Sequence, residues 1–137
     1  MPKWTSIFSR KVSGGVYVMQ DLETHPGSIL FVDSTHAQAT NSISSGKSPD
    51  KPFATLAYVC TNAASLTPAL AAGDVIYVMP GHAETVASAG AITIATAGVK
   101  VIGLGWGAAR PTFSFSATDS SLLITAASVV LKNVRVT

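Results

Sequence analysis

The chain has 137 residues, which fits a single domain, and charged residues make up only 12% of it. Its formal net charge of +2 is too weak to indicate a nucleic-acid partner, which would need a clustered basic face. The sequence contains no run of about 18 apolar residues, the length needed to cross a membrane. The N-terminus lacks the apolar core of a signal peptide. We therefore expect folding in a cytoplasm, no nucleic-acid or membrane partner, and a surface that faces other protein.

Residues 1–28 differ from the rest of the chain and predict an extended N-terminal docking arm with one short strand near 15–19. The segment mixes aromatic and basic residues and is broken by Gly14-Gly15 and by a Pro26-Gly27 turn signal. Its apolar side chains are too scattered to form a core, so we expect them to be buried against a partner. The expected docking residues are Trp4, Ile7, Phe8, Arg10, Lys11 and Tyr17. A solvated arm that contacts nothing is the alternative.

The stretch from residue 29 to residue 51 predicts one strand followed by a long loop. ILFVDS (29–34) is a short apolar run closed by Asp33-Ser34, as is typical of a strand. The segment 35–51 is polar, rich in serine and interrupted by glycine and proline. A loop of this length is unusual in a compact domain, so it indicates either a surface excursion or a partner contact.

A helix is predicted over about 53–64, where apolar residues recur at steps of three and four. Pro52 suits the first turn of this helix, and Pro68 ends any continuation. Ser48 or Asp50 could supply the N-terminal cap. Because the helix directly precedes the strand-rich part of the chain, we expect it to cap the first end of that part.

Short runs rich in β-branched residues follow Gly73 and predict strands that are closed by turn residues. The runs are VIYVM (75–79), AITIA (91–95), VKVIGL (99–104), TFSFS (112–116), SLLIT (121–125) and VVLKNVRV (129–136). Several are apolar almost throughout, which is typical of strands buried between sheet neighbours. The last run ends in what reads as mid-strand, so we expect another chain, or further sequence, to cover that end.

The spacing of these runs predicts stacked turns. VIYVM and VKVIGL begin about 24 residues apart, VKVIGL and SLLIT about 22, and AITIA and TFSFS about 21. Two interleaved series with a period of about 20–24 residues indicate a solenoid in which each turn contributes more than one strand. The sequence thus predicts one mainly β domain over 29–137, and a β-sandwich is the main alternative.

Five motifs together carry a likeness to a known family. They are FVDS (31–34), GKSPDKPFATLAYV (46–59), GDVIYVMPGHAETV (73–86), GVKVIGLGWGAARPTFSF (98–115) and LKNVRV (131–136). In this order they resemble the right-handed parallel β-helix proteins of tailed bacteriophages, whose fold is pectate-lyase-like. The resemblance implies a mainly β fold: a short right-handed parallel β-helix with an N-terminal extended arm and a capping α-helix. It specifies the fold well and the function poorly, because this fold serves lyases, hydrolases, tailspikes and structural pieces.

The resemblance also implies roles for several turn residues. Gly73-Asp74 would form the turn into the first coil, and Pro80-Gly81 the turn that leaves its strand. Asn133 stands where β-helices often place an asparagine in a stacked turn, although here it lies inside a strand-like run. Corner positions that tolerate no side chain would be Gly98, Gly103 and Gly105.

Two glycine motifs resemble phosphate-binding loops only in part. GLGWGA (103–108) contains G-x-G after a strand, but a dinucleotide site needs a helix next, and Pro111 with a predicted strand follows instead. We interpret it as a glycine-rich corner with Trp106 exposed or in contact with a neighbouring chain. Gly46-Lys47-Ser48 lacks the first glycine of a P-loop and predicts a flexible loop.

His82 and Glu84 are the one pair that suggests acid–base chemistry or metal binding. No second histidine or cysteine lies at ligand spacing, so we interpret them as part of a solvated loop after a strand. The single cysteine, Cys60, is interpreted as a small buried apolar residue rather than a nucleophile. Paired carboxylates cannot be placed on one strand face. We therefore expect that the chain is not an enzyme and has no catalytic residue, cofactor or metal ion.

The resemblance and the missing catalytic groups predict a non-enzymatic phage virion structural protein, assembled in the host cytoplasm and located in the virion. The expected role is a capsid decoration or head-fibre subunit attached through the N-terminal arm. Its partners would be other virion proteins, either the major capsid protein or a tail or portal component, and it would form a homo-oligomer such as a trimer. The alternatives are the N-terminal part of a tail fibre or tailspike, with receptor-binding or depolymerase parts elsewhere, and a free carbohydrate-active enzyme.

Overall fold

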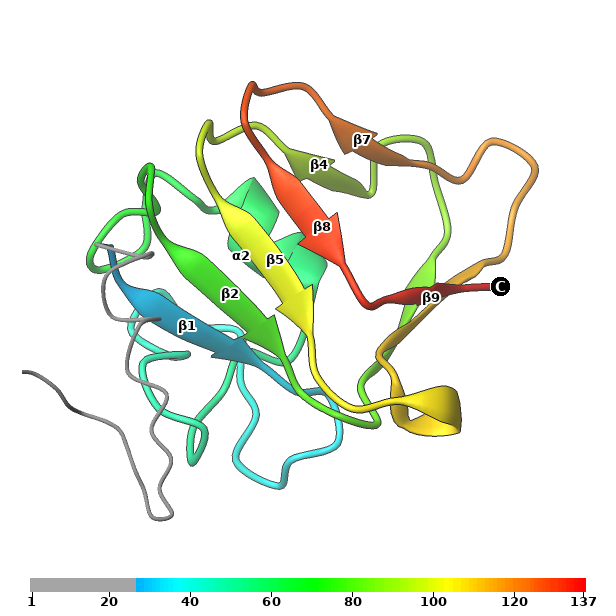
Figure 1. Ribbon diagram of the computed structural model, residues 1–137, viewed down its shortest axis with the longest axis horizontal. Helices are drawn as coiled ribbons and strands as arrows, with labels where there is room; N and C mark the ends of the chain where they lie inside the picture. Colours follow the sequence, from blue (N-terminus) through cyan, green and yellow to red (C-terminus); the bar gives the residue numbers. More distant parts are fainter. Residues whose placement is uncertain (1–26) are drawn as a thin grey trace, which may run out of the picture.

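The computed structural model describes residues 27–137, whose regular structure is mainly strand in three parallel sheets (Figure 1). Sheet A contains, in this order, β1 (Ile29–Val32), β2 (Val75–Val78), β5 (Lys100–Gly103) and β8 (Val130–Lys132). Sheet B contains β3 (Ala83–Val86), β6 (Thr112–Phe115) and β9 (Arg135–Val136). Sheet C contains β4 (Ile92–Ile94) and β7 (Leu122–Ile124). The predicted mainly β class is therefore confirmed.

The chain passes through the three sheets in one fixed order. Strands β2, β3 and β4 enter sheets A, B and C in turn, β5, β6 and β7 repeat that order, and β8 and β9 begin it again. Each strand pairs in parallel with its counterpart in the next pass, so that Val75 lies beside Lys100 and Ile92 beside Leu122. Short strands that alternate with tight turns thus build three parallel sheets that contribute side chains to one core.

The predicted repeat was right for one pairing and wrong for two others. VIYVM and VKVIGL pair as expected, as β2 and β5. AITIA pairs with SLLIT rather than with TFSFS, and VKVIGL pairs onward with the last run, as β5 with β8. The cause is β3, because the sequence predicts a loop where the structure has this strand. With β3 included, one pass holds three strands and partners such as Ile92 and Leu122 lie about 30 residues apart.

Asn133 divides the last predicted run into two strands in different sheets. It has a φ of 59°, in the left-handed region that asparagine tolerates better than most residues. Its side-chain Nδ2 donates to the backbone oxygens of Gly103 and Gly105, both at 2.8 Å. The run therefore turns between β8 and β9, and the asparagine ties this turn to the preceding one.

The turn before β2 is held by a buried aspartate. Gly73 has a φ of 92°, and Asp74 next to it is 4% exposed. The Asp74 carboxylate accepts hydrogen bonds from the backbone N–H groups of Ser28, at 2.6 Å, and Ala71, at 2.8 Å. It thereby joins the start of β1 to the start of β2 and satisfies donors that would otherwise be buried without a partner.

The helix α2 (Leu56–Thr61) is shorter than the predicted 53–64, and it is capped by Thr55 rather than by Ser48 or Asp50. The physical reason is that Phe53 joins the sheet instead of the helix. It bridges to Val32 in parallel, and its N–H donates to the backbone oxygen of Phe31 at 2.9 Å. The helix buries Leu56 and Val59 in the core and packs against β4, behind sheet A in Figure 1.

The core lies between the three sheets and α2 and is built from inward-facing aliphatic side chains with two phenylalanines. Its fully enclosed members include Val32, Phe53, Leu56, Ile76, Val78, Ile92, Val101 and Phe113. The only other helical turn described is the 3₁₀ helix η1 (Gly107–Ala109), between β5 and β6. Among the described residues, no helix is long and apolar enough to span a membrane.

Candidate functional site

His82 and Glu84 form a buried histidine–carboxylate pair. His82 Nε2 lies 3.1 Å from Glu84 Oε2, and the two side chains are 0% and 6% exposed. The expectation that these residues belong to a solvated loop is therefore wrong. Glu84 lies in β3, and both Glu84 and Val86 face inward while Ala83 and Thr85 face solvent. His82 lies two residues before Glu84 and so shares its inward side.

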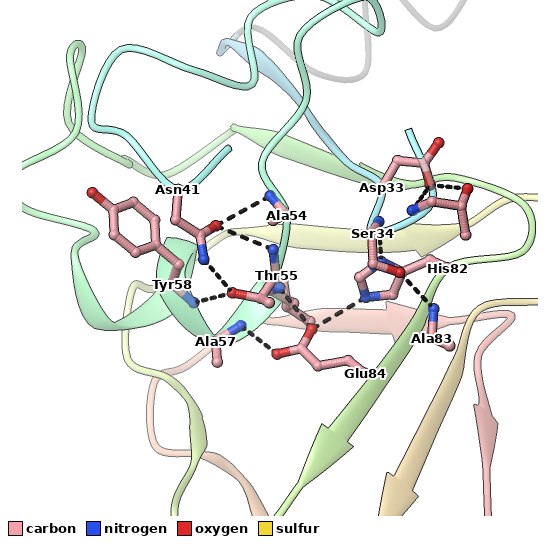
Figure 2. A network of polar contacts seen from close by, with 12 residues as sticks. Asp33, Ser34, Asn41, Ala54, Thr55, Ala57, Tyr58, His82, Ala83 and Glu84 are labelled. Carbon is pink, nitrogen blue, oxygen red and sulfur yellow. Dashed lines mark hydrogen bonds and ion pairs between the residues drawn. The ribbon is translucent and has the colours of Figure 1, made fainter. Parts of the chain in front are cut away.

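Glu84 accepts hydrogen bonds from the first turn of α2. Its two carboxylate oxygens lie 2.7 Å from the backbone nitrogen of Leu56 and 3.0 Å from that of Ala57 (Figure 2). Thr55 Oγ1 accepts from the N–H of Tyr58 at 3.2 Å. The donors that a helix leaves unsatisfied at its N-terminus thus find acceptors, one of them a negative charge.

The long loop of residues 35–51 contributes one further contact at this helix start. Asn41 Oδ1 accepts from the N–H groups of Ala54 and Thr55, at 3.1 and 3.2 Å. Asn41 Nδ2 donates to Thr55 Oγ1 at 3.2 Å. Figure 2 shows Asn41 on one side of the helix start and Glu84 on the other. The middle of the loop is thereby attached to the domain.

His82 is also held from its other side. The backbone N–H of Ser34 donates to His82 Nδ1 at 3.0 Å, and Ser34 Oγ accepts from the N–H of Ala83 at 3.0 Å. Because Nδ1 accepts, it carries no proton, and the N–H of Nε2 is the group directed at Glu84. The ring also packs against Phe113, with centroids 5.7 Å apart.

The arrangement fastens three segments that are distant in the sequence: the end of β1, the start of α2 and β3. A histidine that moves protons for a substrate needs a ring nitrogen that the substrate can reach. Here the two ring nitrogens of His82 are both engaged within the protein, and the side chain has no exposed surface. Within residues 27–137, no three His, Cys, Asp or Glu side chains gather where they could hold a metal ion.

Cys60, in α2, has a thiol that the fold keeps protonated. Burial, and secondarily the negative charge of Glu84, raise the pKa of this thiol from 9.0 to about 12. The folded state therefore favours the neutral thiol. Its contribution to stability is fully present below the ordinary pKa and is lost as pH rises through about 12.

We expect native Cys60 to react with iodoacetamide at pH 8 about a thousandfold more slowly than the same residue in the urea-unfolded chain. Only about one thiol in 10⁴ is ionised at this pH when the pKa is about 12. The chain has no other cysteine, so the loss of free thiol reports this residue alone. Mass spectrometry at timed intervals measures both rates. A native rate within tenfold of the unfolded rate would contradict the assigned environment.

Exposed apolar side chains gather on the last strand of each sheet, which we call the far end: β7, β8 and β9. Among the described residues, each of these strands has a sheet neighbour on one side only. Ile124 lies beside Ile94 in the register of sheet C. Ile94 is buried, at 2% exposed, but Ile124 on the last strand is not. The exposed residues and their exposed fractions are Leu123 (43%), Ile124 (49%), Val130 (41%) and Val136 (61%).

Trp106 is the most exposed large apolar residue within residues 27–137, at 86%. It lies in the loop between β5 and β6, where the glycine-rich motif is followed by the three residues of η1 and then by a strand. The predicted docking residues of the arm lie outside the described residues. They are Trp4, Ile7, Phe8, Arg10, Lys11 and Tyr17.

Comparisons of the chain with protein families, with curated proteins and with solved structures found no match.

Proposed function

We propose that the three sheets are the walls of a short right-handed parallel β-helix, and that the chain is a non-enzymatic structural protein of a phage virion. The fixed order of the sheets and the parallel pairing of each strand with its counterpart in the next pass support the β-helix. A right-handed course follows from the strong preference of parallel crossover connections. The α2 helix, packed against β4, would close the first turn.

The observation that carries the functional proposal is the apolar far end. Edge strands offer unpaired backbone N–H and C=O groups, and proteins normally shield such edges with charge, proline or a covering segment. Here Ile124 and Val136 are about half exposed or more, and Lys132 and Arg135 are the nearby charges. A surface of this kind suits burial, either against another copy of the chain or against sequence that follows residue 137.

The proposed role is a capsid decoration or head-fibre subunit. Its arm would bind another virion protein, either the major capsid protein or a tail or portal component, and the far end would join copies into a homo-oligomer. The buried His82–Glu84 pair supports a structural role, because both groups are used to hold the domain together. The same β-helix interpretation suits the first domain of a tail fibre or tailspike, which localisation on the particle would distinguish.

Charging the far end is expected to reduce self-association. Sedimentation velocity of the chain should give a mass above the 14.0 kDa of one copy, and Ile124→Lys combined with Val136→Lys should return it to one copy. Thr85→Lys is the matched control, because Thr85 is an exposed residue of β3, at the opposite edge of sheet B. A parent chain that stays a single copy at all concentrations would refute assembly through this end.

Removing residues 1–14 is expected to abolish binding to the particle while leaving the domain folded. This deletion removes five of the six predicted docking residues and ends before Gly15. Quantitative mass spectrometry of purified particles from a complemented host would measure occupancy, with the full chain as reference. Equal occupancy of the shortened and the full chain would refute docking through the arm.

A further inference from the structure

The contacts of His82 fix where a further proton can bind to its ring. The N–H of Ser34 donates to Nδ1 at 3.0 Å, and Nε2 directs its proton at Glu84 Oε2, 3.1 Å away. An additional proton therefore binds at Nδ1, where it faces the Ser34 N–H, which is also a donor. Because the His82 side chain has no exposed surface, water cannot supply the missing acceptor while these contacts persist. The closed arrangement thus requires a neutral imidazole.

The acidic groups near the ring do not remove this conflict. The carboxylate of Glu84 attracts an imidazolium, but it contacts Nε2, which already carries a proton. It also accepts the N–H groups of Leu56 and Ala57, and those contacts do not involve Nδ1. From α2, the Cys60 thiol stays neutral because burial raises its pKa to about 12. The proton at Nδ1 therefore finds no acceptor among these groups.

Two charged side chains lie close to His82 along the neighbouring segments, and each makes a hydrogen bond elsewhere. Asp33, at the end of β1, accepts from the backbone N–H and the hydroxyl of Thr35. Arg110, just before β6, donates from Nε to the backbone oxygen of Gly107 at 3.2 Å. The strand β6 itself contributes the ring of Phe113 and has no titratable residue.

Ser34 attaches a surface segment, residues 34–39, to the domain. Besides its N–H contact with His82, its Oγ accepts from the N–H of Ala83, and Figure 2 shows both contacts. Within the described part of the chain, the five residues after Ser34 make local hydrogen bonds only. The next attachment is Thr40, whose N–H donates to the backbone oxygen of Pro52 at 3.0 Å. Loss of the Ser34 contacts would therefore release the whole segment.

We propose that Ser34, His82 and Ala83 form an acid-sensitive latch, which holds segment 34–39 on the domain at neutral pH and releases it when His82 binds a second proton. A solvent-exposed imidazole takes up its proton at about pH 6.5. The open form of the latch exposes the ring and binds this proton, whereas the closed form has no place for it. The stability of the latch is thus fully present above about pH 6.5 and falls below it. The latch stands independently of the virion role proposed above.

Hydrogen exchange in the full, ¹⁵N-labelled chain tests the latch, with protection corrected for the intrinsic exchange rate. Between about pH 7.5 and about pH 5, proton uptake favours the open form by about thirtyfold. We expect protection of the Ser34 and Ala83 amides to fall by about tenfold or more. The amide of Phe31, which donates to Gly46 at 2.8 Å in the same strand, and that of Leu56 are the references. Their protection should change by less than about threefold.

Two variants separate His82 from other causes of acid sensitivity. His82→Gln cannot take up a proton in this range, so the protection of Ala83 should become independent of pH. His36→Gln removes a histidine of the segment itself, whose Nδ1 also accepts a backbone N–H, and should keep the full effect. If His82→Gln does not fold, the contrast between Ser34 and Phe31 in the parent chain still decides the outcome.

Four results would overturn the proposal. One is unchanged protection of Ser34 at the lower pH in the parent chain. A second is an equal loss at Ser34 and Phe31, which indicates acid unfolding of the whole domain. A third is an acid effect that persists in His82→Gln. The fourth is an imidazole spectrum that shows His82 protonated at both nitrogens while Ser34 stays protected, because the closed form would then accommodate the proton.

Discussion

Replacing Glu84 with alanine is expected to lower the free energy of unfolding by about 3 kcal/mol. The change removes the acceptor for the N–H groups of Leu56 and Ala57 and for His82 Nε2. Each donor left unsatisfied in a buried setting costs about 1–3 kcal/mol, and partial access of water to the helix start reduces the sum. Urea unfolding followed by far-UV circular dichroism measures the difference.

Two further variants separate the causes of this loss. Glu84→Gln keeps the shape and one carbonyl oxygen, so we expect about half of the full effect. Thr85→Ala changes the next residue of β3, which is exposed, and should cost less than about 0.5 kcal/mol. A Glu84→Ala variant as stable as Thr85→Ala would show that the pair does not hold α2 to β3.

Phe113→Ala is expected to lower the free energy of unfolding by about 4 kcal/mol, because it empties the centre of the core. Phe113 has no exposed surface, lies in β6 between β3 and β9, and contacts the ring of His82. The loss combines the transfer energy of the ring with the cavity that remains among the enclosing side chains. The midpoint and slope of urea unfolding give the value.

The neighbouring phenylalanine of the same strand supplies the comparison. Phe115 is only partly buried and packs at the border of the core, so Phe115→Ala should cost clearly less. Phe113→Leu, which retains most of the apolar volume, should cost less than about 1.5 kcal/mol. If Phe113→Ala cost no more than Phe115→Ala, the placement of the core between the sheets would be wrong.

The strands after Gly73 could be located from sequence because each is a short β-branched run that ends at a turn residue. β3 could not, because Ala-Glu-Thr-Val reads as polar and its glutamate is buried only through partners elsewhere in the chain. Leu56, which donates to Glu84, is 28 residues away. Because the predicted repeat omits β3, it is too short and pairs two of the runs with the wrong partners.

The start of α2 shows the same limit. Pro52 and Phe53 fit a helix locally, but Phe53 pairs with β1, which lies about twenty residues earlier. Local periodicity reflects the spacing of apolar residues, but it does not show that Phe53 pairs with a distant strand instead of joining the helix. Likewise, the spacing of His82 and Glu84 suggests either an acid–base or metal site or a solvated loop. Their actual partners, Ser34 and the first turn of α2, are brought to them only by the fold.

Strands of successive passes stack in parallel, and backbone NMR gives a direct measurement of this pairing. A three-dimensional NOESY spectrum of the uniformly labelled chain should show inter-strand contacts at the positions where Ile92 faces Leu122 and Glu84 faces Phe113. It should also show the staggered pattern of parallel ladders between β2 and β5. Antiparallel contacts between strands that follow one another in sequence, such as β3 with β4, would contradict the claim.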